Sequence, residues 1–297
     1  MRIAFLGLPL AAILLRADGH EIVIAGLRPS LQVGARRLRR QIGDSRVVID
    51  PQKNWQAFGE QVREARAELL VSWFFTRRIP MSVVEACPMG GVGVHPSLLP
   101  RHRGPDPFFA AIDAGDEFTG VTAHKIAADY DTGEIIAQRA IVLNPAWNAW
   151  NLAKALDRPS ISLLREVVKE ASQTGVVVGM PQNAQEATAA PEPTEEMIEI
   201  RWNQPADRIV RRIRALSPSP GAVVWIGEQE LVVTRAQVDL RVPRALTPGE
   251  AGVVEGVAIV RARDTGVALL AGVLDEEEVG AEEIGRMVRE HQRTSVI

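Results

Sequence analysis

Two short segments of this chain carry residue types that proton transfer requires. His95 lies in the segment Gly93-Val94-His95-Pro96, and Asp131 opens the triplet Asp131-Thr132-Gly133. An imidazole can take up and release a proton near neutral pH, and a carboxylate can orient and charge it. Each signal is weak by itself, because a single histidine on a strand is more often structural and Asp-x-Gly is a common turn.

The first half of the chain alternates apolar, strand-like runs with amphipathic, helix-like segments. Strands are expected at 3–6, 21–25, 47–49, 68–74, 91–95, 120–126 and 135–143. Helices are expected up to residue 17 and at 55–67, 81–87, 107–114 and 148–171, the last broken by Pro159. This alternation predicts an α/β fold with a Rossmann-like, open, mostly parallel sheet. Sites in such sheets lie beyond the carboxyl ends of the strands, where His95 is placed.

The composition changes after this region. Residues 179–198 are rich in proline and small or polar residues, which is typical of a linker. A helix at 207–216 is followed by five short strand-like runs at 221–226, 231–237, 252–254, 258–263 and 266–273, with a closing helix at 282–292. We therefore expect a first domain at 1–178, a linker at 179–198, and a smaller β-barrel-like (OB-like) domain at 199–297.

The bulk composition narrows the class of protein. The chain has 297 residues, of which 46% are hydrophobic, and its net charge of −3 gives no general attraction to nucleic acid or anionic membranes. The single Cys87 excludes an internal disulfide and is expected to be a buried apolar residue rather than a nucleophile. The five histidines show no metal-ligand spacing, so we predict no metal. The longest uncharged run, 3–15, is too short to span a bilayer, and we expect a cytoplasmic protein.

Taken together, several motifs resemble the folate-dependent formyltransferases. They are the run His95-Pro96-Ser97-Leu98-Leu99-Pro100-Arg101, then Arg103-Gly104, Gly120-Val121-Thr122, and Asp131-x-Gly133. The resemblance implies the formyltransferase fold and transfer of a formyl group from 10-formyltetrahydrofolate to an amine. It also implies that His95 handles protons and charge while Asp131 is its carboxylate partner.

The resemblance further implies which residues hold the folate. The expected set consists of residues at the end of the strand at 68–74 and just after it, in the loop after His95, and around Asp131. These are Phe74, Phe75, Arg77, Ser97, Leu98, Leu99, Pro100, Asp129, Thr132 and Gly133.

One position departs from the family pattern, because Gly93 stands where the family has asparagine. Loss of one oxyanion donor typically lowers the rate on the order of 10²–10³-fold. Three outcomes follow. Another donor replaces the asparagine, the glycine makes room for water or a different acceptor, or the protein binds ligands and is catalytically silent. The sequence offers four candidate donors, which are Ser72, Thr76, His102 and His124.

The C-terminal part bears on the acceptor. The segment 198–222, with Ile200-Arg201-Trp202 and Pro218-x-Pro220-Gly221-Ala222, is similar to the start of the C-terminal domain of methionyl-tRNA formyltransferases. The leading expectation is therefore formylation of initiator methionyl-tRNA, and the alternative is another amine, such as an amino sugar nucleotide. Two basic clusters are candidate RNA contacts or solvated helix faces, namely Arg36, Arg37, Arg39 and Arg40, and Arg211, Arg212 and Arg214. Residues 199–297 hold 13 arginines and 15 acidic residues, a net charge of 13 − 15 = −2, which does not favour RNA.

Overall fold

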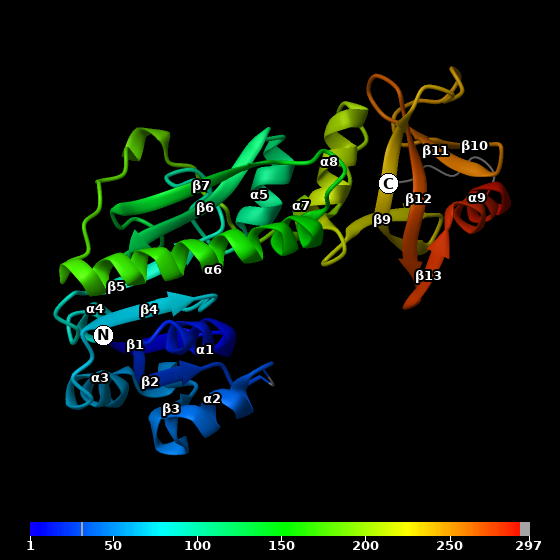
Figure 1. Ribbon diagram of the computed structural model, residues 1–297. Coiled ribbons are helices and arrows are strands. Elements are labelled where there is room, and N and C mark those ends of the chain that lie inside the picture. The colour runs from blue at the N-terminus through cyan, green and yellow to red at the C-terminus, as the bar shows by residue number, and fades with distance from the viewer. Residues whose placement is uncertain (31, 292–297) are drawn as a thin grey trace. The chain divides into compact units, whose positions relative to one another are not determined.

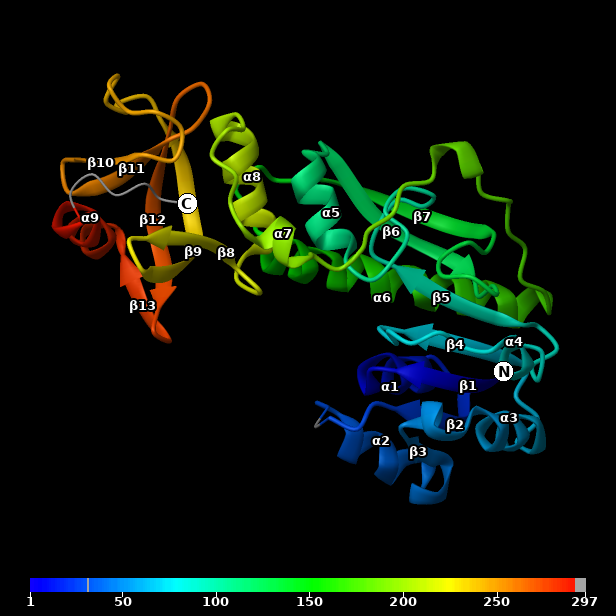
Figure 2. The same cartoon turned by 180° about the vertical axis from the view of Figure 1, so that it is seen from behind.

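The computed structural model describes residues 1–30 and 32–291, which form two compact units (Figures 1 and 2). The first unit contains residues 1–105, 119–141 and 155–189. The second contains 106–118, 142–154 and the described residues from 190 onward. The chain passes into the second unit for the last time at 189–190, inside the expected linker, and two earlier segments, 106–118 and 142–154, also join that unit. Within 1–30 and 32–291, no helix combines the length and apolarity needed to cross a membrane.

The first unit is built on a seven-stranded sheet with the order β3-β2-β1-β4-β5-β6-β7. Its strands are β1 (Arg2–Gly7), β2 (Glu21–Leu27), β3 (Val47–Ile49), β4 (Leu69–Trp73), β5 (Gly91–His95), β6 (Phe118–Lys125) and β7 (Ile135–Val142). Strands β1 to β5 pair in parallel, and β6 runs antiparallel to β5. The predicted open, mostly parallel α/β sheet is confirmed.

The apolar sequence of the strands accounts for their central position. Ile3 to Leu6 of β1 are fully buried, as expected for parallel strands covered on both faces. The covering helices of this region are α1 (Pro9–Ala17), α2 (Ala35–Ile42), α3 (Trp55–Glu64) and α4 (Met81–Val84). Gly7 connects β1 to α1 with φ of 127°, and a Cβ there would lie 1.8 Å from the carbonyl oxygen of Trp73. Glycine is therefore required at this turn.

Helix α6 (Ala149–Thr174) differs from the expected broken helix, because it continues through Pro159. An interior proline costs about 3 kcal/mol through its lost hydrogen bond and ring clash. Leu152, Leu156, Leu163 and Leu164 are buried along the same helix, and burying each such side chain contributes roughly 1.5–3 kcal/mol. The predicted break is wrong because this apolar face outweighs the local cost of the proline.

The second unit holds an antiparallel sheet with the order β10-β11-β12-β9-β8, and β13 pairs with β12. Its strands are β8 (Ala222–Ile226), β9 (Gln229–Asp239), β10 (Ala251–Val254), β11 (Val257–Arg261), β12 (Gly266–Leu274) and β13 (Glu277–Gly280), and its helices are α5 (Pro107–Ala114), α7 (Glu195–Ile198), α8 (Ala206–Leu216) and α9 (Ala281–Glu290). All five expected strands are present and curl into a barrel-like sheet (Figure 1). Strand β13 was not expected, and Gln292 of the expected closing helix lies outside the described residues.

Candidate active site

Neighbouring strands bring three positions to one face of the sheet. Gly93 on β5 pairs with His124 on β6, and His95 pairs with Thr122. Direct cross-strand partners share a face, as do residues two apart on a strand. Gly93, His95 and His124 therefore face the same side, and both histidines are buried, with 6% and 7% of their surface exposed.

Asp131 joins the two imidazoles. Its Oδ2 lies 3.4 Å from Nδ1 of His95, and its Oδ1 lies 3.6 Å from Nε2 of His124. The backbone N–H of Gly104 donates to Oδ2 at 3.0 Å. The structure thus brings together the His95 and Asp131 of the motif, and it adds His124.

The other ring nitrogens of both histidines bond to backbone carbonyls. Nε2 of His95 lies 2.8 Å from the oxygen of His102, and Nδ1 of His124 lies 2.9 Å from the oxygen of Lys125. Because a carbonyl oxygen only accepts, each of these nitrogens carries a proton. Burial lowers the pKa of His124, the nearby His95 lowers it further, and Asp131 opposes both. His124 is therefore neutral near pH 7, with an unprotonated Nε2 facing the carboxylate.

Backbone groups and one amide hold Asp131 in a left-handed conformation, with φ of 56°. Nε2 of Gln182 donates to the carbonyl oxygens of Asp131 and Gly133 at 2.7 and 2.6 Å, and Oε1 of Gln182 accepts two hydrogen bonds from Arg103. A Cβ on Gly133 would lie 1.8 Å from the carbonyl oxygen of Lys125. The Arg103-Gly104 and Asp131-x-Gly133 motifs are therefore joined through Gln182 and the N–H of Gly104 in one hydrogen-bond network that holds the Asp131 carboxylate.

The segment 97–100 packs beside the site and is held by hydrogen bonds to neighbouring residues. Ser97 and Leu99 are buried, and the Ser97 hydroxyl donates to the carbonyl of Arg101 at 2.7 Å. Thr122 Oγ1 donates to the carbonyl of Ser97 and accepts from the N–H of Leu99. A Cβ on Gly120 would lie 2.7 Å from Cδ2 of Leu98, and the Pro100 carbonyl accepts from the N–H of Thr188. These contacts give the segment a packing role. None of its four residues expected to hold the folate is among the residues that line the larger cavity of the unit.

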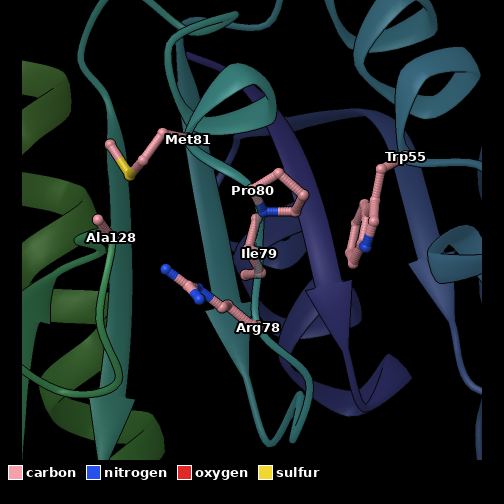
Figure 3. Close-up of a pocket in the computed structure, with 6 residues that line it drawn as sticks. All are labelled: Trp55, Arg78, Ile79, Pro80, Met81 and Ala128. Carbon is pink, nitrogen blue, oxygen red and sulfur yellow. The ribbon is translucent and has the colours of Figure 1, made fainter.

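A cavity of about 420 Å³ lies beside the loop that leads to Asp131. Its lining is mostly apolar and comprises Trp55, Arg78, Ile79, Pro80, Met81 and Ala128 (Figure 3). Figure 3 shows the Arg78 guanidinium extending toward the loop of Ala128, and Arg78 Nη2 lies 3.6 Å from a carboxylate oxygen of Asp129. The folate region expected from the resemblance, near 74–78 and 127–133, includes Arg78 and Ala128, whereas Trp55 and residues 79–81 were not expected.

The remaining expected folate residues lie near this cavity without lining it. Phe75 and Arg77 line a second cavity of about 110 Å³, and Phe75 packs edge-on against Trp55 at 5.9 Å between ring centroids. Phe74 packs against Trp73 at 4.7 Å. The Thr132 hydroxyl donates to the carbonyl of Asp129 at 3.1 Å.

The four candidate replacements for the family asparagine are placed very differently. Ser72 is buried on β4 and pairs with Gly93, and Thr76 is exposed in the loop after β4. His102 gives its carbonyl oxygen to His95, and its Nδ1 lies 3.5 Å from the hydroxyl of Thr188. Of the four, His124 is the residue whose side-chain nitrogen faces both Gly93 and Asp131.

The two arginine clusters also differ. On α2, Arg36, Arg37 and Arg40 are exposed, and the described residues provide them with no ion pair, whereas Arg39 pairs with Asp44 at 3.6 Å. The α8 arginines bind inside their own unit. Arg211 pairs with Asp207, Arg212 pairs with Asp113, and Arg214 donates to the carbonyls of Pro145 and Trp147.

In residues 1–30 and 32–291, no group of three or more His, Cys, Asp or Glu side chains is placed to hold a metal ion. Burial raises the pKa of the Cys87 thiol to about 12. A thiol with so high a pKa is a poor nucleophile at neutral pH, in line with the apolar role expected for it.

Comparisons with known proteins match both parts of the chain. Residues 35–168 match the family described as formyl transferase, and residues 193–286 match the formyl transferase C-terminal domain. A methionyl-tRNA formyltransferase from Anaeromyxobacter dehalogenans (strain 2CP-C) is 32% identical over 284 residues, which is 91% of this chain and 90% of that protein.

Solved structures support the fold. HypX from Aquifex aeolicus, solved with tetrahydrofolic acid, superposes with a TM-score of 0.67 at 18% identity, over 97% of this chain and 48% of HypX. This chain thus spans about half the length of HypX. An N-formyltransferase from Helicobacter canadensis, solved with folinic acid and dTDP-3-aminofucose, superposes with a TM-score of 0.65 at 15% identity, over 90% of this chain and 98% of that one. Likenesses at such identities concern the fold alone.

Proposed function

Since this chain belongs to the formyl transferase family, we propose that it transfers the formyl group of 10-formyltetrahydrofolate to the amino group of methionyl-tRNA. The observation that carries the acceptor is the extent of the similarity. The methionyl-tRNA formyltransferase relative matches along 91% of this chain, which includes the C-terminal unit. The reaction belongs to translation initiation and takes place in the cytoplasm, where aminoacyl-tRNA is found.

The larger cavity supports the folate half of this proposal. Trp55, Ile79, Pro80 and Met81 provide a largely apolar lining that suits a flat heteroaromatic ring. Arg78 offers a positive charge for a carboxylate tail. Ala128, which lines the cavity, and its neighbour Asp129 lie on the loop that carries Asp131. The loop that borders the cavity therefore also carries the carboxylate of the proton-handling site.

The exposed arginines of α2 support the RNA half. Arg36, Arg37 and Arg40 have no carboxylate partner among the described residues, so their charge is available to phosphates. We propose these three side chains as the acceptor contact. The α8 arginines are weaker candidates, because their guanidinium groups already bind Asp207, Asp113 and backbone carbonyls.

The α8 contacts also favour a second acceptor class. Because these α8 arginines are neutralised inside their own unit, they offer little free positive charge for a large polyanion. An amino sugar nucleotide, with its small diphosphate, needs fewer cationic contacts.

The test presents the purified chain with 10-formyltetrahydrofolate and either methionyl-tRNA or a dTDP-amino sugar. We expect formyl-methionyl-tRNA, detected by acid gel or mass spectrometry, and formation of only the formylated sugar would reassign the acceptor. Folate binding is measured separately by calorimetry. Met81→Trp should fill the cavity and abolish binding, whereas Met180→Trp, at a side chain that is 71% exposed, should leave it intact. Folate binding with neither formyl transfer nor hydrolysis of 10-formyltetrahydrofolate would instead indicate a catalytically silent relative.

A further inference from the structure

A side chain from the next strand borders the place where Gly93 lacks one. A Cβ built on Gly93 would lie 3.5 Å from Nε2 of His124, 3.7 Å from its Cε1 and 3.8 Å from Cγ1 of Ile126. These are ordinary van der Waals separations. The polar atom beside the family asparagine position is therefore Nε2 of His124.

The two imidazoles of the site both face Asp131, but it is the ring of His124 that lies among the nearest atoms to the Gly93 position. Nε2 of His95 bonds the carbonyl oxygen of His102 at 2.8 Å, and its Nδ1 lies 3.4 Å from Oδ2 of Asp131. Nε2 of His124 likewise lies 3.6 Å from Oδ1 of Asp131, and its Nδ1 bonds the carbonyl oxygen of Lys125 at 2.9 Å. That bond fixes the neutral tautomer and leaves Nε2 with a lone pair that can accept a proton.

The groups facing His124 suit a proton acceptor. Asp131 faces it from the loop after β6, with Oδ1 at 3.6 Å from Nε2, and His95 faces the same carboxylate from β5. From β6 itself, the carbonyl of Lys125 accepts from Nδ1. Burial keeps the pKa of His124 low, so the ring is neutral before reaction. Once it gains a proton, Asp131 is near enough to stabilise the imidazolium.

We propose that Nε2 of His124 is the proton acceptor of this formyl transfer and that, once protonated, it serves as the oxyanion donor that Gly93 cannot provide. The inference rests on the proposed function. The amine lone pair attacks the formyl carbon, and the carbonyl π electrons move to oxygen. The amine proton passes to Nε2, whose N–H then lies beside the developing negative charge. When the bond from carbon to the folate nitrogen breaks, its electron pair stays on that nitrogen, which takes the proton back from His124.

The test compares four variants by kcat, KM and pH profile. His124→Ala should lower kcat on the order of 10²–10³-fold with unchanged folate binding. His124→Gln keeps a hydrogen-bond donor but cannot take a proton, so it should recover only a small part of the rate. In the wild type, kcat/KM should fall with acid as His124 becomes protonated, and this limb should be absent in both variants. Gly93→Asn in the His124→Ala background should recover part of the rate by restoring an amide donor.

His20→Ala is the matched control, because His20 is also a buried histidine with a pKa lowered by burial, at the turn between α1 and β2. Wild-type kcat and pH profile in His124→Ala, or near-wild-type kcat in His124→Gln, would overturn the proposal. If the wild type formylates neither acceptor, the acceptor assignment fails by itself, and hydrolysis of 10-formyltetrahydrofolate becomes the readout. Hydrolysis that is insensitive to His124→Ala, or absent in the wild type, would then overturn the role of His124.

Discussion

Helices α2 and α8 have similar sequences and opposite electrostatic roles. Both place arginines on successive turns, as Arg36, Arg37, Arg39 and Arg40 on α2 and as Arg208, Arg211, Arg212 and Arg214 on α8. On α2 three of the four are exposed without a carboxylate partner among the described residues. On α8 Arg212 makes two hydrogen bonds to Asp113, at 2.6 and 2.9 Å, and also donates to the carbonyl of Met197.

The difference shows that a count of charges does not identify a nucleic-acid surface. Asp113 lies on α5, far from α8 in sequence, and only the fold brings it beneath Arg212. The side chains of this pair are 20% and 15% exposed, so the charge of Arg212 is largely neutralised before any ligand arrives. Exposed and unpaired arginines are the ones that phosphates can use.

The strongest test of the comparison is a stability measurement on α8. Arg212→Ala leaves the carboxylate of Asp113 poorly compensated, since Arg208 is 4.0 Å away, and should lower the free energy of unfolding by about 2–3 kcal/mol. Arg36→Ala should change it by less than about 0.5 kcal/mol. Urea denaturation followed by tryptophan fluorescence and circular dichroism measures both. Equal effects of the two substitutions would remove the distinction between the helices.

A smaller effect is expected in RNA binding, where substitutions on α2 rather than on α8 should matter. Arg36→Ala/Arg37→Ala/Arg40→Ala should weaken binding of methionyl-tRNA about tenfold and reduce the dependence of log K on log salt by about 2. The control Arg63→Ala/Arg158→Ala/Lys169→Ala removes the same charge from other exposed positions. Filter binding at several salt concentrations gives the slopes. If the control lowers the slope as much, α2 provides only general charge.

The smallest effect concerns an arginine between these extremes. Arg165 on α6 is 41% exposed yet donates two hydrogen bonds to the carboxylate of Asp18. These bonds are the main reason that the pKa of Asp18 lies below its ordinary value of 3.8. The folded-state pKa is depressed, so the stabilisation is present above pH 3.8 and is lost as pH falls through the folded value. Asp18→Asn should cost under about 1 kcal/mol at pH 7. Thermal melts should show that difference shrinking in acid, and a pH-independent difference would exclude the ion pair as its source.

The sequence predicts most of the sheet because its strands are continuous apolar runs. The expected strands at 3–6, 47–49 and 91–95 coincide closely with β1, β3 and β5. Helix α6 was predicted with a break because a local rule for Pro159 competes with burial that depends on the fold. Strand β13 was missed because Glu277 and Glu278 carry charge where an apolar pattern is expected, and pairing with β12 supplies the missing signal.

The site was predictable only where spacing along the chain reflects geometry. The motif named His95 and Asp131, and their side chains do meet. The cavity lining could not be read in the same way, because Trp55 begins α3 while Met81 begins α4 and Ala128 follows β6. The opposition of Gly93 and His124 depends on the register of β5 and β6, which hydrophobic patterns do not fix.

Gln182 has a consequence for anyone who shortens this chain. A fragment ending at residue 178, the boundary that composition predicts, would retain His95, His124 and Asp131 but would lose the amide that fastens the loop of Asp131. It would also lose Thr188, whose hydroxyl and carbonyl accept from the N–H groups of His102 and Arg103. Part of the segment expected to be a linker, from Gln182 to Thr188, therefore belongs to the reaction centre that precedes it.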